Sequence, residues 1–348
     1  MTIAYFTAPI AYRRMDDTLT IFDGGCSREA AAVWLLPVPF DATTSYRPGT
    51  ALGPEAIRLA STQLERLDPV FGDAATRVWM EPSNPEIEQL SKETRALAEP
   101  IIAQGAEASA DGETVATIDA AGERVRKLTR DFCLAAINAG KIPGLVGGEH
   151  SVSLGGIEAA TSTNPEIGIL QIDAHMDLRN SYQGLRHSHA SIMHNALTPG
   201  SGITKLVQVS IRDISPEEIE LATDDPRIAT MFDHAIAEQL GTGRPLISLL
   251  DEAIEALPEV VYLTIDIDGL DPSLCPRTGT PVPGGLTFNQ FTMLVNRLSV
   301  SGRRIVGFDL VEVAPDPVAD PGTCLDSIMG ARALLRACGA AMRSHQMF

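Results

Sequence analysis

Short runs of apolar residues, rich in Val, Ile and Leu, recur along the chain and constrain its fold more than any other feature. Most of them are apolar at nearly every position, which is typical of strands buried on both faces of a parallel sheet. They lie at residues 31–36, 142–146, 167–172, 206–211, 260–267 and 304–311. Segments with helical periodicity separate them, at residues 121–139, 151–160, 217–222, 286–298 and 327–342. Strands that alternate with helices predict a three-layer α/β/α fold, in which helices cover both faces of a mostly parallel central sheet.

The chain of 348 residues contains no repeat and no low-complexity linker that would divide it, so we expect a single domain over residues 1–348. Two segments depart from the alternating pattern. Residues 81–119 are polar and acidic and include a stretch rich in Gly, Ala, Ser and Asp, which predicts an insertion that forms a surface turn or loop. Residues 1–25 show little periodicity, and we expect them to form an arm that packs on the body or on a neighbouring subunit.

The charge of the chain excludes some classes of partner. Forty-five acidic and 27 basic residues give a formal net charge of −18, which opposes binding to nucleic acids and to anionic membranes. No secretory signal and no apolar stretch of about 18 residues is apparent. The five cysteines are scattered and form no C-x-x-C pair, as expected of reduced thiols. We therefore expect a cytoplasmic protein, whose acidity fits a cationic partner as well as a solvated surface.

The segment Asp173-Ala174-His175-Met176-Asp177 directly follows one of the predicted strands. On an extended chain, residues two apart share one face, so Asp173, His175 and Asp177 would point the same way. Open α/β sheets place their ligand sites at the carboxyl ends of parallel strands. The position and the residue types together indicate a metal site.

Two other predicted strands end in similar residues. Asp266 and Asp268 follow the strand at 260–265, and His150 follows the strand at 142–146 after two glycines. Each feature has a plain structural explanation, because aspartates often cap turns and a single histidine is more often a core residue than a ligand. Since all three motifs occupy the same place at the end of a predicted strand, we favour metal ligation.

The motifs together offer six candidate metal ligands, which are His150, Asp173, His175, Asp177, Asp266 and Asp268. Carboxylates and imidazoles without thiolates favour hard or borderline divalent cations, so we expect Mn²⁺, with Ni²⁺ as the main alternative. Six ligands are too many for one ion with an open position, but they suit two ions about 3.5–4 Å apart. Four carboxylates balance two such ions, and an added hydroxide leaves one negative charge that a cationic substrate would neutralise.

Ordered motifs across nearly the whole chain resemble the ureohydrolase superfamily of arginases and agmatinases, and its agmatinase-like branch in particular. They are VPFDATTSYRPGTALGPEAIR at residues 38–58, GGEHS, DAHMD, SHAS, DIDGLDPSLCPRTGTPVPGGLT at residues 266–287, and GFDLVEVAP at residues 307–315. The resemblance implies an arginase-like fold and a hydrolase that releases urea from a small cationic guanidino substrate. It also implies a homo-oligomer, as a trimer or hexamer, with a hetero-oligomer as a further arrangement.

The resemblance implies roles for individual residues. One ion would be held by His150, Asp173, Asp177 and Asp266, and the other by Asp173, His175, Asp266 and Asp268. Glu312 would pair with the substrate guanidinium, to which a carboxylate offers two parallel charge-assisted hydrogen bonds. His189 would shuttle a proton at the leaving nitrogen, as an imidazole can near neutral pH. His187 lies two residues away and could be mistaken for His189.

The implied reaction follows from these parts. Two ions lower the pKa of a bound water towards neutrality, Asp177 aims the resulting hydroxide at the guanidino carbon, and His189 protonates the departing amine. Catalytic roles therefore fall to Asp177, His189 and Glu312.

Two features depart from well-known agmatinases, and the second of them bears on the substrate. Glu149 replaces a common Asp and should alter only indirect support of His150. The sequence His189-Ala190-Ser191 replaces a common His-Gly-Thr, and Arg186 beside it would contact the substrate tail and repel the ammonium of agmatine. The alternatives are therefore a guanidine, substituted guanidine, biguanide (metformin-type) or guanidino-acid hydrolase, with Ni²⁺ as the metal, and a formiminoglutamase-like enzyme. A non-catalytic subunit of a hetero-oligomer is a further alternative, which the presence of every expected site residue argues against.

Overall fold

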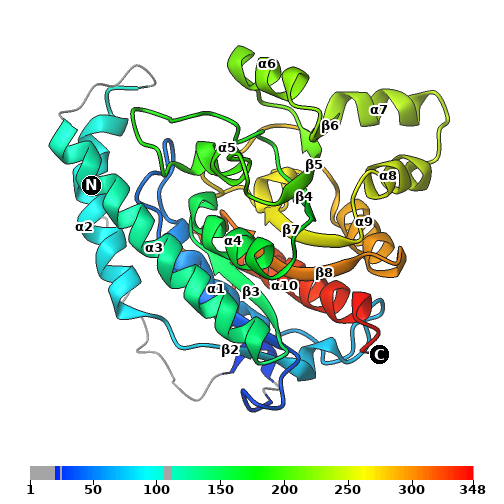
Figure 1. Cartoon of the computed structure of the whole chain (residues 1–348). Helices are drawn as coiled ribbons and strands as arrows, with labels where there is room; N and C mark the ends of the chain where they lie inside the picture. Colours follow the sequence, from blue (N-terminus) through cyan, green and yellow to red (C-terminus); the bar gives the residue numbers. More distant parts are fainter. Residues whose placement is uncertain (1–19, 24–25, 106–111, 348) are drawn as a thin grey trace, which may run out of the picture.

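The computed structural model describes residues 20–23, 26–105 and 112–347, and in them an eight-stranded sheet is the central layer (Figure 1). The strands are β1 (Val33–Val38), β2 (Val78–Met80), β3 (Ile142–Gly147), β4 (Ile167–Ile172), β5 (Ile203–Ile211), β6 (Ile228–Phe232), β7 (Val260–Asp266) and β8 (Arg304–Val311). All neighbours are parallel, in the order β2-β1-β3-β8-β7-β4-β5-β6. The predicted parallel α/β fold is therefore confirmed.

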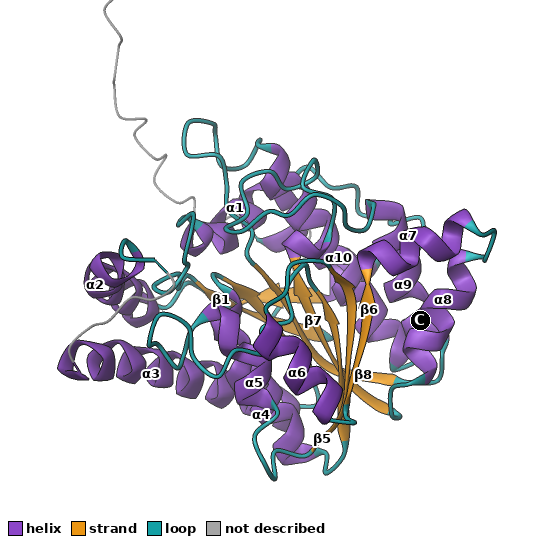
Figure 2. Ribbon diagram, turned by 90° about the horizontal axis from the view of Figure 1, so that it is seen from above, coloured by secondary structure: helices purple, strands orange, loops and turns teal. Residues whose placement is uncertain are grey.

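Helices cover both faces of the sheet, as Figure 2 shows from above. The helices are α1 (Gly53–Ser61), α2 (Pro85–Ile102), α3 (Gly112–Asn138), α4 (Leu154–Thr163), α5 (Ile192–Ala196), α6 (Pro216–Asp224), α7 (Asp233–Gly241), α8 (Leu246–Glu255), α9 (Phe288–Val300) and α10 (Leu325–Ser344). Side chains of α1 and of α7 to α10 share one hydrophobic core with one face of the sheet. Helices α3 to α6 pack on the opposite face, and α2 packs on α3. None of the helices in the described part of the chain is long and apolar enough to cross a membrane.

All six predicted strands exist, and the two that sequence reasoning missed, β2 and β6, lie at the two edges of the sheet. Both are short, and only their first residues are buried. An edge strand contacts fewer neighbours than a central strand, so its side chains need not be continuously apolar. The pattern that predicts buried strands is therefore absent from β2 and β6.

The prediction of a surface turn or loop over residues 81–119 is wrong for most of that segment. It contains α2 and the first part of α3, while residues 106–111 lie outside the described residues. Asn84 caps α2 by accepting a hydrogen bond from the amide of Glu86, and Pro85 occupies the first turn. Buried residues then recur three or four positions apart along α2, so a polar composition concealed an amphipathic helix.

The predicted N-terminal arm falls largely outside the described residues. Within residues 20–23, Ile21 and Phe22 are buried, and the amide of Phe22 donates a hydrogen bond to Oγ of Ser61 in α1. This short piece packs on the body, as expected of the arm. The extent of a single domain over residues 1–348 stays a prediction.

The strand order determines where a site can form. Strands β3, β8, β7 and β4 lie in this order at the centre of the sheet. Strands β3 and β4 are consecutive in the sequence, but β8 and β7 lie between them. Because all four are parallel, the residues that follow them meet at one edge of the sheet. His150, Asp173 and Glu312 lie just beyond these strand ends, and Asp266 is the last residue of β7.

Candidate metal centre

The aspartates and the histidine at the carboxyl ends of β4 and β7 converge because a tight turn follows each strand. Oδ1 of Asp173 accepts a hydrogen bond from the amide of His175, and Oδ1 of Asp266 accepts one from the amide of Asp268. The interpretation of these aspartates as turn caps is thus correct, and it is compatible with their other carboxylate oxygens facing the site. Gly269 completes the second turn, since a Cβ there would lie 2.6 Å from the amide nitrogen of Asp173.

Asp177 faces the site from a backbone conformation that differs from the extended one expected. The chain beyond β4 is not extended, and Asp177 itself has a left-handed backbone with φ of 54°. Its carbonyl oxygen accepts hydrogen bonds from the amides of Met193 and His194 in α5, which hold this conformation. A non-glycine residue in this region costs about 1–3 kcal/mol and marks a position that the surrounding structure constrains.

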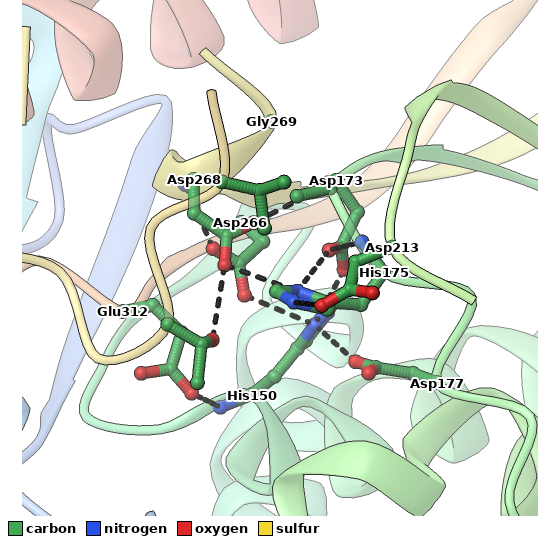
Figure 3. A network of polar contacts seen from close by, with 12 residues as sticks. His150, Asp173, His175, Asp177, Asp213, Asp266, Asp268, Gly269 and Glu312 are labelled. Atoms are coloured by element: carbon green, nitrogen blue, oxygen red, sulfur yellow. Dashed lines mark hydrogen bonds and ion pairs between the residues drawn. The ribbon is translucent and has the colours of Figure 1, made fainter. Parts of the chain in front are cut away.

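The imidazole of His150 points towards the carboxylates of three aspartates (Figure 3). Its Nδ1 is 2.9 Å from Oδ2 of Asp177, 3.1 Å from Oδ2 of Asp173 and 3.5 Å from Oδ2 of Asp266. The atom is buried, yet it has no properly oriented hydrogen-bond partner among the described residues. We call His150, Asp173 and Asp266 the first group, because one ligand atom from each could bind the same ion.

A second group consists of Asp173, His175 and Asp268. Nδ1 of His175 lies 3.2 Å from Oδ2 of Asp268 and 3.5 Å from Oδ1 of Asp173. Nε2 of the same ring is 3.9 Å from the exposed carboxylate of Asp213, which sequence reasoning did not single out. Asp173 belongs to both groups and turns a different oxygen to each histidine, as a carboxylate between two ions would.

The electrostatics of the two groups also fit bound cations. Burial lowers the pKa of His150, but the carboxylates of Asp173 and Asp177 outweigh burial and raise it well above the usual value. Burial likewise lowers the pKa of His175, and Asp268 and Asp173 raise it above the usual range. Burial raises the pKa of Asp266, and the nearby carboxylates of Asp268 and Asp173 raise it further. Several buried acids this close together require positive charge among them, which divalent cations provide.

The donor set therefore fits two divalent cations with oxygen and imidazole ligands. Every candidate ligand is buried except His175, whose side chain is 23% exposed. The carboxylates and imidazoles match ions of the Mn²⁺, Fe²⁺, Co²⁺, Ni²⁺ or Zn²⁺ type, and thiolates are absent from both groups. The structure brings all six predicted ligands together.

Glu312 follows β8 and lies beside the first group. It is 1% exposed, which rules out the alternative of an exposed carboxylate at a strand end. Oε1 accepts a hydrogen bond of 2.9 Å from the amide of His150, whereas Oε2 is buried without a partner in the part of the chain described. Glu312 also has a left-handed backbone, with φ of 62°. Its free oxygen is available to a donor group that enters the site.

His189 lies on the other side of Glu312, with its Nδ1 3.6 Å from Oε1. Nε2 of His189 accepts a hydrogen bond from the amide of Ser45 at 3.3 Å and lies 3.1 Å from Oγ of Ser45. The amide of His189 donates to Oγ1 of Thr43. Burial lowers the pKa of His189, but Glu312 outweighs burial and raises it above the usual value. The ring is therefore fixed in position, with Nε2 as an acceptor and Nδ1, which faces Glu312, as the nitrogen that carries a proton.

Glu149 supports the site differently from our expectation. Its carboxylate accepts hydrogen bonds of 2.7 Å from the amide of Thr43, from Oγ1 of Thr43 and from Oγ of Ser151. It holds Thr43, whose Oγ1 in turn accepts a hydrogen bond from the amide of His189, and no hydrogen bond among the described residues joins it to the imidazole of His150. Sequence reasoning also missed Thr43 and Ser45, although both lie inside the motif at residues 38–58.

Helix α2 also forms hydrogen bonds to the segment that contains Thr43. Nη1 of Arg95 donates a hydrogen bond of 2.7 Å to the carbonyl of Thr44. Oγ of Ser91 accepts a hydrogen bond from the amide of Asp41 and donates one to its carboxylate. The segment predicted to be an insertion therefore contributes to the frame of the site.

Arg186 and His187 lie apart from the metal ligands. The amides of both residues donate hydrogen bonds to Oδ1 of Asp119 in α3. His187 packs on Gly122 of α3, where a Cβ would lie 2.6 Å from the Cβ of His187. Arg186 is exposed, and no described hydrogen bond or ion pair joins its side chain to the site. His189, and not His187, is the histidine that lies beside Glu312, while its catalytic role and a role of Arg186 in substrate binding stay predictions.

Comparisons with known proteins agree with this geometry. The family model of the arginase family matches residues 31–337. An N(1)-aminopropylagmatine ureohydrolase of Thermus thermophilus is 35% identical over 288 residues, which cover 83% of this chain and 84% of that protein. An agmatinase of Bacillus anthracis is 32% identical over 294 residues, which cover 83% of this chain and 86% of that protein. The crystal structure of the agmatine ureohydrolase of Thermoplasma volcanium superimposes with a TM-score of 0.69 and 25% identity, covering 94% of this chain and 96% of that chain.

The match to the family model spans most of the chain, including every candidate ligand, Glu312 and His189. The similar proteins are hydrolases of guanidino compounds. This chain belongs to the arginase family and is an agmatinase-like ureohydrolase, an enzyme that cleaves a carbon–nitrogen bond of a guanidino compound.

Proposed function

We propose that the enzyme hydrolyses a guanidinoalkylamine of the agmatine class, with or without an aminopropyl extension, using two Mn²⁺ ions. The buried free oxygen of Glu312 is the observation that carries this proposal. A buried carboxylate oxygen without a partner is costly unless a charged donor pairs with it, and a guanidinium matches the geometry of a carboxylate. The names of the relatives in Thermus thermophilus and Bacillus anthracis support an amine tail on the substrate.

The proposed ligand sets are His150, Asp173, Asp177 and Asp266 for one ion, and Asp173, His175, Asp266 and Asp268 for the other. Their short mutual distances and the buried Nδ1 of His150, which has no hydrogen-bond partner among the described residues, support this assignment. The ions would supply a hydroxide nucleophile near neutral pH by lowering the pKa of water.

The residues around the ions have separate tasks in the proposed reaction. Glu312 binds the guanidinium and fixes its plane beside the first group. Asp177, whose Oδ2 faces the first group, accepts a hydrogen bond from the nucleophile and orients it towards the guanidino carbon. His189, on the other side of Glu312, donates a proton to the leaving amine, so that an amine and urea depart.

A substrate panel with controlled metals tests the proposal. Protein freed of metal by chelation is reloaded with Mn²⁺, Ni²⁺, Co²⁺ or Zn²⁺ and assayed for urea with agmatine, aminopropylagmatine, arginine, guanidinobutyrate, guanidine and a biguanide. We expect the highest kcat/KM with Mn²⁺ and a guanidinoalkylamine. If guanidinobutyrate, guanidine or the biguanide is preferred, the proposed substrate class is wrong. Preference for Ni²⁺ would contradict the proposed metal.

The ligand assignment has its own test. Asp266→Ala should abolish turnover and reduce the number of bound ions, because the residue belongs to both proposed ligand sets. Full turnover by this variant would disprove the assignment. The expected cytoplasmic location and the trimeric or hexameric assembly stay predictions from the sequence.

A further inference from the structure

A row of polar side chains crosses the buried sheet directly beneath the metal centre. Five residues on five neighbouring strands stand side by side in register, in the order Asp309 (β8), Thr264 (β7), Gln171 (β4), Gln208 (β5) and Thr230 (β6). We call these five residues the polar row. Its first four members are fully buried, where unpaired polar groups are costly. Apolar residues would fill a sheet between two helical layers at less cost, so the polar row calls for another explanation.

One branch of the polar row ends at Asp173. Nε2 of Gln208 donates hydrogen bonds to the carbonyl of Met176 at 2.8 Å and to Oε1 of Gln171 at 2.7 Å. Nε2 of Gln171 in turn donates to Oδ2 of Asp173 at 2.8 Å and to the carbonyl of His175 at 3.2 Å. Oγ1 of Thr230 donates to Oε1 of Gln208 at 2.8 Å.

The direction of this branch is fixed from both of its ends. A carbonyl oxygen can only accept, so the Met176 carbonyl requires the amide nitrogen of Gln208 to face it. Oε1 of Gln171 must then face Gln208, which turns the amide nitrogen of Gln171 towards Asp173. The carboxylate of Asp173 and the carbonyl of His175 require the same orientation independently. The orientation of the Gln171 amide is therefore fixed, and its Nε2 donates the hydrogen bond to Asp173.

The other branch ends at His150. Oγ1 of Thr264 donates a hydrogen bond of 2.7 Å to Oδ1 of Asp309 and lies 2.8 Å from Nε2 of His150. The single hydroxyl proton of Thr264 points to the carboxylate, so its oxygen accepts the Nε2 proton of His150. The lone pair of a neutral His150 is then on Nδ1, the atom that faces the carboxylates of the first group.

We propose that the polar row positions two metal ligands, holding His150 in the tautomer that binds through Nδ1 and holding Oδ2 of Asp173 towards the first group. This inference rests on the proposed ligand sets. Partners of this kind orient metal ligands, and their loss typically weakens metal binding by about 10- to 100-fold. Gln171, Gln208, Thr264 and Asp309 thus act through the ligands rather than on the substrate.

Metal titration of single variants tests the inference. Thr264→Val removes the hydroxyl from one branch, and Gln171→Met removes the amide from the other, at nearly constant volume. Mn²⁺ binding to metal-free protein is measured by calorimetry, and unfolding is measured without metal. We expect each variant to bind Mn²⁺ about 10- to 100-fold more weakly than the unaltered protein. Unchanged affinity in both variants would overturn the inference.

A matched control separates positioning from packing. Thr129 in α3 is also fully buried, and its hydroxyl bonds only to the carbonyl of Arg126 among the described contacts. Thr129→Val should keep Mn²⁺ affinity unchanged, even if its unfolding midpoint falls as far as that of Thr264→Val. Equal losses of affinity in the two variants would mean that burial of a hydroxyl, and not its place in the polar row, determines metal binding.

Two further comparisons keep the test decisive. If Thr264→Val does not fold, Thr264→Ser and Thr264→Ala replace it, and only the serine variant should bind Mn²⁺ as the unaltered protein does. Equal affinity in this pair would contradict the role of Thr264. Failure of the unaltered protein to bind two ions would instead disprove the proposed ligand sets, so the two failures are distinguishable.

Discussion

Nδ1 of His189 lies 3.6 Å from Oε1 of Glu312, so a guanidinium bound by Glu312 would lie within reach of the imidazole. The same carboxylate raises the pKa of His189 against the effect of burial. In the proposed reaction, one residue would therefore bind the substrate and also raise the pKa of its neighbour. This coupling leads to the first two predictions.

Glu312→Gln should lower kcat/KM by about 10- to 100-fold, because an amide cannot form two charge-assisted hydrogen bonds with a guanidinium. The Gln can still accept the hydrogen bond from the amide of His150. Steady-state kinetics of urea release measure the effect, and Glu65→Gln at an exposed position is the matched control. A Glu312→Gln enzyme with unaltered kcat/KM would exclude Glu312 as the guanidinium receptor.

His189→Gln should lower kcat by about 10²- to 10⁴-fold, the usual contribution of a general acid. A general acid acts in its protonated form, so the rate of the unaltered enzyme falls as pH rises above the pKa of His189. This alkaline limb should vanish from the pH profile of kcat in His189→Gln. It should move to lower pH in Glu312→Gln, because the carboxylate that raises the pKa is lost. His187→Gln is the control, and a larger loss there than in His189→Gln would refute the assignment.

Asp177→Gly should be more stable than Asp177→Ala, although both should be inactive. Asp177 has φ of 54°, where glycine avoids a strain of about 1 kcal/mol that alanine retains. Denaturant unfolding of metal-free protein measures the difference. The same pair of substitutions at Asp131, within α3, should give the opposite order, because glycine destabilises a helix. The same order at both positions would argue against strain at Asp177.

Metal binding should release protons. Nearby carboxylates raise the pKa of both His150 and His175, so the metal-free protein holds protons that bound ions displace. The metal-free form carries more protons than the loaded form, and Mn²⁺ affinity should therefore fall as pH is lowered through neutrality. Calorimetry in buffers of different ionisation enthalpy counts the released protons. Affinity that does not change with pH would contradict this account of the two groups.

The sequence predicted the central part of the fold better than its periphery. Strands β4 and β8 begin and end where their apolar runs do, because both are buried on both faces. The edge strands β2 and β6 lack that signature, and α2 was hidden by its polar composition. The N-terminal cap at Asn84 and the spacing of the residues that α2 buries are both visible in the sequence. The many charged residues of this segment nevertheless suggested a loop.

The candidate ligands were predictable because each one follows a recognisable strand. The residues that support these ligands could not be predicted, because a polar residue within an apolar stretch of sequence does not reveal the partners of its hydrogen bonds. Gln171 and Thr264 each stand two residues before a candidate ligand, and this shared spacing was available as a signal. Thr43 and Ser45 contact His189 from more than 140 positions away, a pairing that only the folded chain reveals.

The position of β8 in the sheet distinguishes the two proposed ion sites. Strand β8 is made last, yet it pairs with β3 on one side and β7 on the other, so it joins two parts of the sheet. The second group follows only β4 and β7, which are direct neighbours, whereas the first group also needs His150 from beyond β3. The residues of the second group therefore belong to one part of the sheet, whereas those of the first group come from the two parts that β8 joins. An ion held by the first group would therefore crosslink the two parts of the sheet and oppose their separation.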